Sequence, residues 1–211
     1  MKAFIFDLDG VLVFTDNYHF QAWKAMADEM GIPFTPEIND LLRGVSRMES
    51  LEIILRNYHG PALSEERKHH LAEEKNRRDR TMLAKMEPSD VSGDVLHVLH
   101  TLRSRGMKIA LGSSSKNARF ILERTGLLPL FDAISDGNTI TRSKPDPEVF
   151  LKAAEFLGLP CDSCVVVEDA RAGIDAAKAA GMMAAGIGDA KSYALTDYPL
   201  DNILQILDII T

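Results

Sequence analysis

Hydrophobic and polar positions divide the chain into two kinds of segment. A short apolar run at 2–6 predicts a buried strand, and this run ends at a carboxylate, Asp7. From about residue 14 to residue 86, apolar residues recur at three- and four-residue spacing, which predicts helices throughout. The clearest helical patterns lie at 18–30, 47–58 and 64–86. No strand pattern interrupts this block.

Beyond residue 87, strand and helix patterns alternate. Predicted strands lie at 107–112, 132–136, 164–169 and 183–188, and predicted helices lie at 94–106, 116–126, 147–158 and 173–181. Continuously apolar strands that alternate with helices are typical of a parallel sheet covered on both faces. We therefore predict an α/β fold with two parts. A Rossmann-like, doubly wound parallel-sheet core comprises residues 1–13 and 87–211, and an all-helical cap domain is inserted at 14–86.

Composition and charge exclude several classes of partner. The 211 residues are 45% hydrophobic, which is enough to bury a full core. The net charge of -7 gives no electrostatic footprint for nucleic acid or for an anionic membrane. The chain has no apolar run of about 18 residues, and its first residues reach carboxylates too early for a signal peptide. We expect a cytoplasmic protein that binds neither nucleic acid nor membrane.

The two cysteines form a C-x-x-C pattern, Cys161 and Cys164. No second cluster of Cys or His completes a zinc site, and an apolar run follows directly. We interpret both as ordinary packing residues.

Polar clusters follow the predicted strands of the core. Asp7 and Asp9 end the first strand, and three further clusters lie at 112–117, 143–147 and 168–173. Because the carboxyl ends of parallel strands meet at one edge of a sheet, we expect these four clusters to converge there.

The residue types at this edge predict a phosphate site with a metal. Carboxylates would repel one another unless a cation neutralised them, and ligands that are all oxygen suit Mg²⁺. The carboxylates are Asp7, Asp9, Glu168 and Asp169. Lys144 adds a positive charge, and the hydroxyl and backbone N–H groups around Ser113 and Ser114 add anion donors. Of the first two acids, one could attack phosphorus while the other moves protons. Each cluster alone also fits a solvated turn or a helix cap.

Taken together, four motifs resemble those of the haloacid dehalogenase superfamily. They are the "FDLDGVL" segment, Ser113 after "KIALG", Lys144 in "SKPDP", and the acidic pair of "VVVEDARAG". The resemblance implies a phosphoaspartate enzyme with Asp7 as nucleophile and Asp9 as general acid/base. It also implies that Asp7, the backbone carbonyl of Asp9 and Asp169 hold Mg²⁺, with Glu168 assisting.

Within that superfamily, the segments 18–32, 41–55, 73–76 and 110–117 resemble the β-phosphoglucomutase family. The resemblance implies that His19 links sugar binding to cap closure and to alignment of Asp9, and that Arg47 grips the phosphate that is not transferred. It further implies contacts to this phosphate or to the sugar from Thr15, Trp23, Gly44, Val45, Lys75, Ser115, Lys116 and Asn117. Ser113, Ser114 and Lys144 would bind the transferred phosphate.

Two phosphate sites distinguish a mutase from a phosphatase. Moving a phosphoryl group between two sugar carbons requires a bisphosphate that binds with either end at the aspartate, whereas a monoester phosphatase needs one site. Arg47 would supply the second site, since a guanidinium binds phosphate in a bidentate manner. We therefore expect interconversion of β-D-glucose 1-phosphate and glucose 6-phosphate through β-D-glucose 1,6-bisphosphate.

Several alternatives stay open. A sugar-phosphate or small-metabolite phosphatase on the same fold is the nearest alternative, followed by a silent binding module and a phospho-acceptor signalling domain. The preferred β-hexose 1-phosphate is also open, and a monomer is the family expectation. The two hinge strands are expected at 13–15 and 84–87. Phe14 departs from the family, which more often has an acidic residue there, and Asp16 is a possible substitute.

Overall fold

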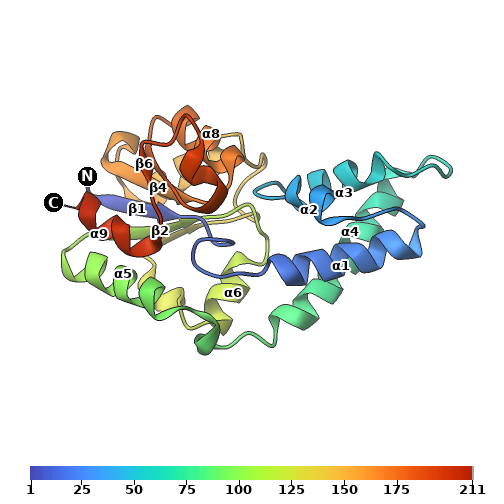
Figure 1. Ribbon diagram of the computed structural model, residues 1–211, viewed down its shortest axis with the longest axis horizontal. Helices are drawn as coiled ribbons and strands as arrows, with labels where there is room; N and C mark the ends of the chain where they lie inside the picture. Colours follow the sequence, from blue (N-terminus) through green and yellow to red (C-terminus); the bar gives the residue numbers. More distant parts are fainter. Residues whose placement is uncertain (211) are drawn as a thin grey trace.

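A six-stranded parallel sheet lies at the centre of the larger part of the protein (Figure 1). The computed structural model describes residues 1–210. The strands are β1 (Ala3–Phe6), β2 (Lys108–Gly112), β3 (Ala133–Ser135), β4 (Cys164–Glu168), β5 (Met183–Gly186) and β6 (Tyr198–Pro199), and their order across the sheet is β3-β2-β1-β4-β5-β6. The five strands predicted from the apolar runs are confirmed. The two-residue strand β6 was not predicted, because it is too short to carry a strand pattern.

Helices cover both faces of the sheet, because alternate residues of a strand point to opposite faces. Phe4 and Phe6 of β1 pack with the apolar residues of one set of helices, while Ala3 and Ile5 pack with those of another. The first set is α5 (Gly93–Ser104), α6 (Ala118–Arg124) and α9 (Ile206–Ile209), and the second is α7 (Glu148–Leu157) and α8 (Arg171–Ala179). All four residues of β1 are fully buried. The doubly wound core predicted from the sequence is confirmed.

Four helices between β1 and α5 lie beyond the sheet, at the right of Figure 1. They are α1 (Asp16–Glu29), α2 (Pro36–Asp40), α3 (Arg47–Leu55) and α4 (Glu65–Leu83). Trp23, Met26, Leu51, Ile54 and Leu71 belong to a hydrophobic cluster of their own, separate from the two clusters against the sheet. We refer to α1–α4 as the cap. The boundaries 14–86 stay a prediction.

Short 3-10 helices complete the chain at Pro88–Asp90, Leu128–Leu130, Cys161–Ser163, Gly188–Ser192 and Ile203–Gln205. Within residues 1–210, none of the helices has the length and the apolar character that crossing a bilayer requires. Cys161 and Cys164 are both free thiols, and burial raises the pKa of Cys164 to about 11. The thiol of Cys164 is therefore protonated at neutral pH, in agreement with a packing role.

Candidate active site

The turn after β1 places two aspartates at the carboxyl edge of the sheet. The backbone N–H of Asp7 donates to the carbonyl of Val167 in β4 (2.9 Å), which continues the strand pairing by one residue. The chain then turns sharply at Gly10, which has a φ of 78°. A Cβ at this position would overlap the carboxylate of Asp169, so only glycine lets the turn approach β4 so closely.

Lys144 is the buried counter-ion of this edge. Its side chain is completely buried, and its Nζ lies 2.5 Å from Oδ1 of Asp7 and 2.5 Å from Oε1 of Glu168. Burial opposes protonation of Lys144, but the two carboxylates outweigh burial and hold the pKa of the ammonium above its ordinary value. One cation is thus shared between two buried acids.

Three carboxylates form a group that fits a divalent cation. Asp7, Glu168 and Asp169 each offer an oxygen, and these oxygens lie within 4.8 Å of one another. Burial, together with the neighbouring Glu168, raises the pKa of Asp169 to about 7, and burial raises the pKa of Asp7 well above its ordinary value. Lys144 alone leaves this group with excess negative charge, and a set of oxygen ligands is what Mg²⁺ prefers. The donor set therefore fits Mg²⁺.

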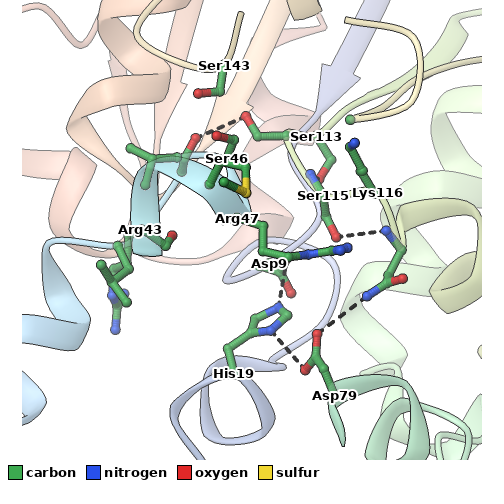
Figure 2. Close-up of a pocket in the computed structure, with 18 of the residues that line it drawn as sticks. Asp9, His19, Arg43, Ser46, Arg47, Asp79, Ser113, Ser115, Lys116 and Ser143 are labelled. Carbon is green, nitrogen blue, oxygen red and sulfur yellow. Dashed lines mark hydrogen bonds and ion pairs between the residues drawn. The ribbon is translucent and has the colours of Figure 1, made fainter. Parts of the chain in front are cut away.

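The side chain of Asp9 lies apart from this group and faces the cap (Figure 2). It accepts a hydrogen bond from the hydroxyl of Thr15, which is fully buried. Its other oxygen lies 3.9 Å from Nε2 of His19. Only the backbone carbonyl of Asp9 was expected to reach the metal, so this orientation agrees with a separate role for the side chain.

His19 is surrounded by charged groups of α4. Its Nδ1 lies 3.0 Å from Oδ1 of Asp79 and 3.1 Å from Nζ of Lys75. Burial and Lys75 disfavour the protonated imidazole, but Asp79 and Asp9 outweigh them and raise the pKa of His19 to about 9. Lys75 is itself buried and lies 5.0 Å from the ring centroid of Trp23.

The loop after β2 is held by hydrogen bonds within the loop and by one to the cap. The backbone N–H of Ser115 donates to Oγ of Ser113 (3.2 Å), and that of Asn117 donates to Oγ of Ser115 (3.1 Å). The hydroxyl of Ser114 donates to the carbonyl of Gly44 in the cap (3.0 Å). Ser114 therefore joins the cap to the core, in addition to lying beside the predicted site of the transferred phosphate.

A single cavity of about 370 Å³ collects most of the predicted residues. It is lined by Asp7, Asp9, His19, Trp23, Gly44, Val45, Arg47, Lys75, Ser113, Ser114, Ser115, Lys116, Asn117 and Asp169. The predicted residues Thr15, Lys144 and Glu168 are fully buried behind the lining. Thr15 contacts Asp9, Lys144 contacts Asp7, and Glu168 contacts Lys144. Arg47 begins α3, and its guanidinium lies 2.8 Å from Oε1 of Glu73.

The sequence analysis missed several residues that join the cap to the core. Arg43 lies 2.8 Å from Asp16 and 3.5 Å from Asp169, and the hydroxyl of Ser143 donates to Glu49. At the cap junction, Asp16 thus forms an ion pair with the guanidinium of Arg43. Phe14, the residue that departs from the family, is 75% exposed. For Arg43 the sequence offered only a weak signal, which is that it directly precedes Gly44, a predicted site residue.

Asp79 was also missed, although it lies one helical turn after Lys75, on the same face of α4. Its partners could not be read from spacing, because His19 is 60 residues earlier on another helix.

Comparison with known proteins shows the family to which the chain belongs. The family model for haloacid dehalogenase-like hydrolases matches residues 1–181. The chain belongs to this family, in agreement with its parallel sheet and its carboxylate edge. The superfamily membership expected from the four motifs is therefore confirmed.

Within the class, the chain is similar to β-phosphoglucomutases over nearly its whole length. It is 44% identical over 191 residues to β-phosphoglucomutase of Bacillus subtilis strain 168, across 89% of this chain and 84% of that protein. A solved structure of β-phosphoglucomutase from Clostridium difficile has a TM-score of 0.93 and 36% identity, covering 100% of this chain and 95% of that one. The chain is also 33% identical over 184 residues to a phosphorylated carbohydrates phosphatase of Thermotoga maritima, across 86% and 82% of the two chains. These similarities confirm the expected resemblance to the β-phosphoglucomutase family.

Proposed function

We propose that this protein interconverts β-D-glucose 1-phosphate and glucose 6-phosphate, with β-D-glucose 1,6-bisphosphate as intermediate and activator. One observation carries the proposal. The same cavity is lined by two groups of side chains whose chemistry suits phosphate, one at the sheet edge and one where the cap meets the loop after β2. Asp7 and Ser113, with Lys144 beneath them, form the first group, and Arg47, Lys116 and Asn117 contribute to the second.

Asp7 is the proposed nucleophile. Its Oδ1 is held by the ammonium of Lys144, so the carboxylate is fixed at the cavity floor and its charge is partly neutralised when a phosphate arrives. In the cycle, β-D-glucose 1-phosphate binds to enzyme that carries a phosphoryl group on Asp7. Asp9 takes the proton from the 6-hydroxyl, the sugar oxygen forms a bond to phosphorus, and the bond from phosphorus to Asp7 breaks.

The second half of the cycle reverses the roles. The bisphosphate reorients, and a carboxylate oxygen of Asp7 attacks the phosphorus at carbon 1. The bond from that phosphorus to the sugar oxygen breaks, and Asp9 returns its proton to this oxygen. Glucose 6-phosphate leaves, and Asp7 again carries a phosphoryl group.

Arg47, Ser115, Lys116 and Asn117 would hold the phosphate that is not reacting at each step. The guanidinium of Arg47 binds Glu73 when no phosphate competes, and a phosphate with two charges is the stronger partner for it. His19, Trp23 and Lys75 line the cavity from the cap and would contact the sugar.

Asp7, Asp169 and the carbonyl of Asp9, with Glu168 assisting, would hold Mg²⁺ in this proposal. When bound, the cation would neutralise charge on the transferring phosphoryl group. In this proposal, contacts between cap and core would limit the access of water to the cavity floor. These are Ser114 with Gly44, Ser143 with Glu49, and Arg43 with Asp169.

A coupled assay tests the proposal. Purified protein, Mg²⁺ and a trace of the bisphosphate should convert β-D-glucose 1-phosphate to glucose 6-phosphate, detected by glucose-6-phosphate dehydrogenase. Inorganic phosphate is measured in the same samples. Release of phosphate without glucose 6-phosphate would reject the mutase and select the second candidate, a sugar-phosphate phosphatase.

The phosphatase is retained as second candidate because of the similarity to the phosphorylated carbohydrates phosphatase. Assays with the β-1-phosphates of other hexoses settle the preferred sugar. A monomeric state and a cytoplasmic location stay predictions.

A further inference from the structure

Asp79 is a buried acid that the proposed reaction does not use. It lies near the end of α4 and is 1% exposed, although it has no assigned role in phosphate or metal binding. A buried carboxylate without compensation costs several kcal/mol, so its partners indicate why it is retained. Burial disfavours the ionised form of Asp79, but His19 and Lys75 of the cap outweigh burial and lower its pKa to about 2. Asp79 is therefore ionised at neutral pH.

The two oxygens of Asp79 have different partners. Oδ2 accepts from Nζ of Lys75 (3.2 Å) and from Nδ2 of Asn117 (3.4 Å). Among the described residues 1–210, Oδ1 has no hydrogen-bond partner, and Nδ1 of His19 faces it as an ion-pair partner at 3.0 Å. Nζ of Lys75 also lies 3.1 Å from Nδ1 of His19, but it can donate to Oδ2 instead. A proton on Nδ1 is then the one group in place to serve the buried Oδ1.

This contact fixes the orientation of the imidazole. With Nδ1 bound to Asp79, the opposite ring nitrogen, Nε2, faces Oδ2 of Asp9 at 3.9 Å. Figure 2 shows the three side chains in a row, with His19 between the two carboxylates. Thr15 holds the other oxygen of Asp9. The row therefore begins at Asp79, which lies away from the reacting atoms, and ends at Asp9, the proposed acid/base.

Asn117 connects the row to the core. It precedes α6 and donates from Nδ2 to Asp79 and to Oδ1 of Asn76 (3.0 Å). Asp79 is thus the point at which α1, α4 and the loop after β2 meet. If the cap moved away from this loop, Asp79 would lose one of its three donors.

We propose that Asp79 is a positioning residue that aims His19 at Asp9 and links this alignment to docking of the cap on the loop after β2. The inference rests on the proposed function, because aligning Asp9 matters only where Asp9 exchanges a proton with the sugar oxygen.

Asp79→Asn tests this role, since it keeps the shape of the side chain and removes its charge. Acetyl phosphate separates two steps, because its acetate leaving group needs no proton from Asp9 when Asp7 is phosphorylated. Conversion of β-D-glucose 1-phosphate should fall about 10- to 100-fold in kcat/KM. Formation of the acyl phosphate on Asp7 from acetyl phosphate should stay within about twofold of the unaltered protein. An equal loss of both activities would assign Asp79 to the fold alone and overturn the proposal.

Two further variants sharpen the result. Asp28→Asn removes the same charge from an exposed position of α1 and should leave both activities unchanged. In a double-mutant cycle, Asp79→Asn should add little to the loss caused by His19→Gln, because Asp79 acts through His19. Losses that multiply independently would overturn the proposal.

A measurement on the unaltered protein does not depend on how a variant folds. Nitrogen-15 NMR of the His19 ring should show a proton on Nδ1, and an Nδ1 without a proton would also overturn the proposal. This measurement still reports on the contact with Asp79 if the protein has no mutase activity. Failure of the proposed function is then distinguished from failure of this inference.

Discussion

Nζ of Lys144 lies 2.5 Å from Oδ1 of Asp7, although 137 residues of sequence separate them. Both side chains are buried, and the same ammonium also contacts Glu168 at the end of β4. Without this cation the two acids would repel one another in a medium of low dielectric constant. The ion pair with Lys144 therefore holds the proposed nucleophile, Asp7, in place, and it also stabilises the carboxyl edge of the sheet.

Replacing Lys144 should weaken the fold. We expect Lys144→Met to lower the free energy of unfolding by about 3 kcal/mol, because it leaves two buried carboxylates without their cation. Urea denaturation in the presence of EDTA measures this change. Lys24→Met, at an exposed ion pair of α1, should change it by less than about 1 kcal/mol. Equal stability of Lys144→Met and the unaltered protein would contradict the role of this cation.

Replacing the nucleophile should stop turnover. We expect Asp7→Asn to lower kcat at least about 1,000-fold, because an amide cannot form the acyl phosphate. The unaltered protein, incubated with acetyl phosphate, should gain one phosphoryl group by intact mass spectrometry, and the variant should gain none. Mutase activity retained by Asp7→Asn would rule out the assignment of Asp7.

Replacing Arg47 should impair the reaction with the sugar phosphate and not phosphorylation of Asp7 by acetyl phosphate. In Arg47→Ala we expect kcat/KM for β-D-glucose 1-phosphate to fall about 100-fold or more, since the second phosphate loses its bidentate partner. Phosphorylation of Asp7 by acetyl phosphate, which has a single phosphate, should change much less. Arg67→Ala, at an exposed position of α4, is the matched control. A parallel loss of both reactions would count against a role at the second phosphate.

Removal of the divalent cation should be detectable in the absence of substrate. Mg²⁺ should raise the melting temperature of the unaltered protein, because a ligand that binds only the folded state stabilises it by mass action. The increase should be much smaller in Asp169→Asn, which removes one carboxylate of the group. EDTA should abolish mutase activity, and excess Mg²⁺ should restore it. Activity that persists in EDTA would contradict a metal role for this group.

The contact between His19 and Asp79 should give a pH-dependent contribution to stability. The pKa of His19 is raised to about 9, so its contribution is complete below about pH 6.5 and is lost as pH rises through 9. The pKa of Asp79 is lowered to about 2, so its contribution is present above about pH 4 and is lost as pH falls through 2. The stability difference between the unaltered protein and Asp79→Asn should therefore be largest between about pH 4 and 6.5.

Chemical denaturation at a series of pH values checks this window. We expect a difference of about 2 kcal/mol at pH 6, declining towards pH 9. When Asp79→Asn is made in a His19→Gln background, the loss of stability that it causes should not decline above pH 6.5, because no imidazole is left to titrate. A difference that is independent of pH between 6 and 9 would contradict an ion pair between these residues.

The sequence by itself determined five of the six strands of the core and the set of polar groups at the carboxyl edge of the sheet. The apolar run 164–167 is bounded by polar residues and forms a strand beside β1, and residues that end parallel strands meet at one edge. Asp7 and Asp169 could therefore be placed together from their positions after strands, and Lys144 from its position just before a helix. Resemblance to a known family then added the cap residues His19 and Arg47.

Tertiary structure alone decided which side chains join the cap to the core. The contacts of Asp79 with Asn117 and of Arg43 with Asp169 depend on how helices pack in three dimensions, as does the contact of Asp79 with His19 within the cap. Helical spacing shows which residues share a face, but it does not show what that face will meet. A strand edge is specified by local pattern, whereas the docking of one helix on a distant loop is specified by the packing of the whole chain.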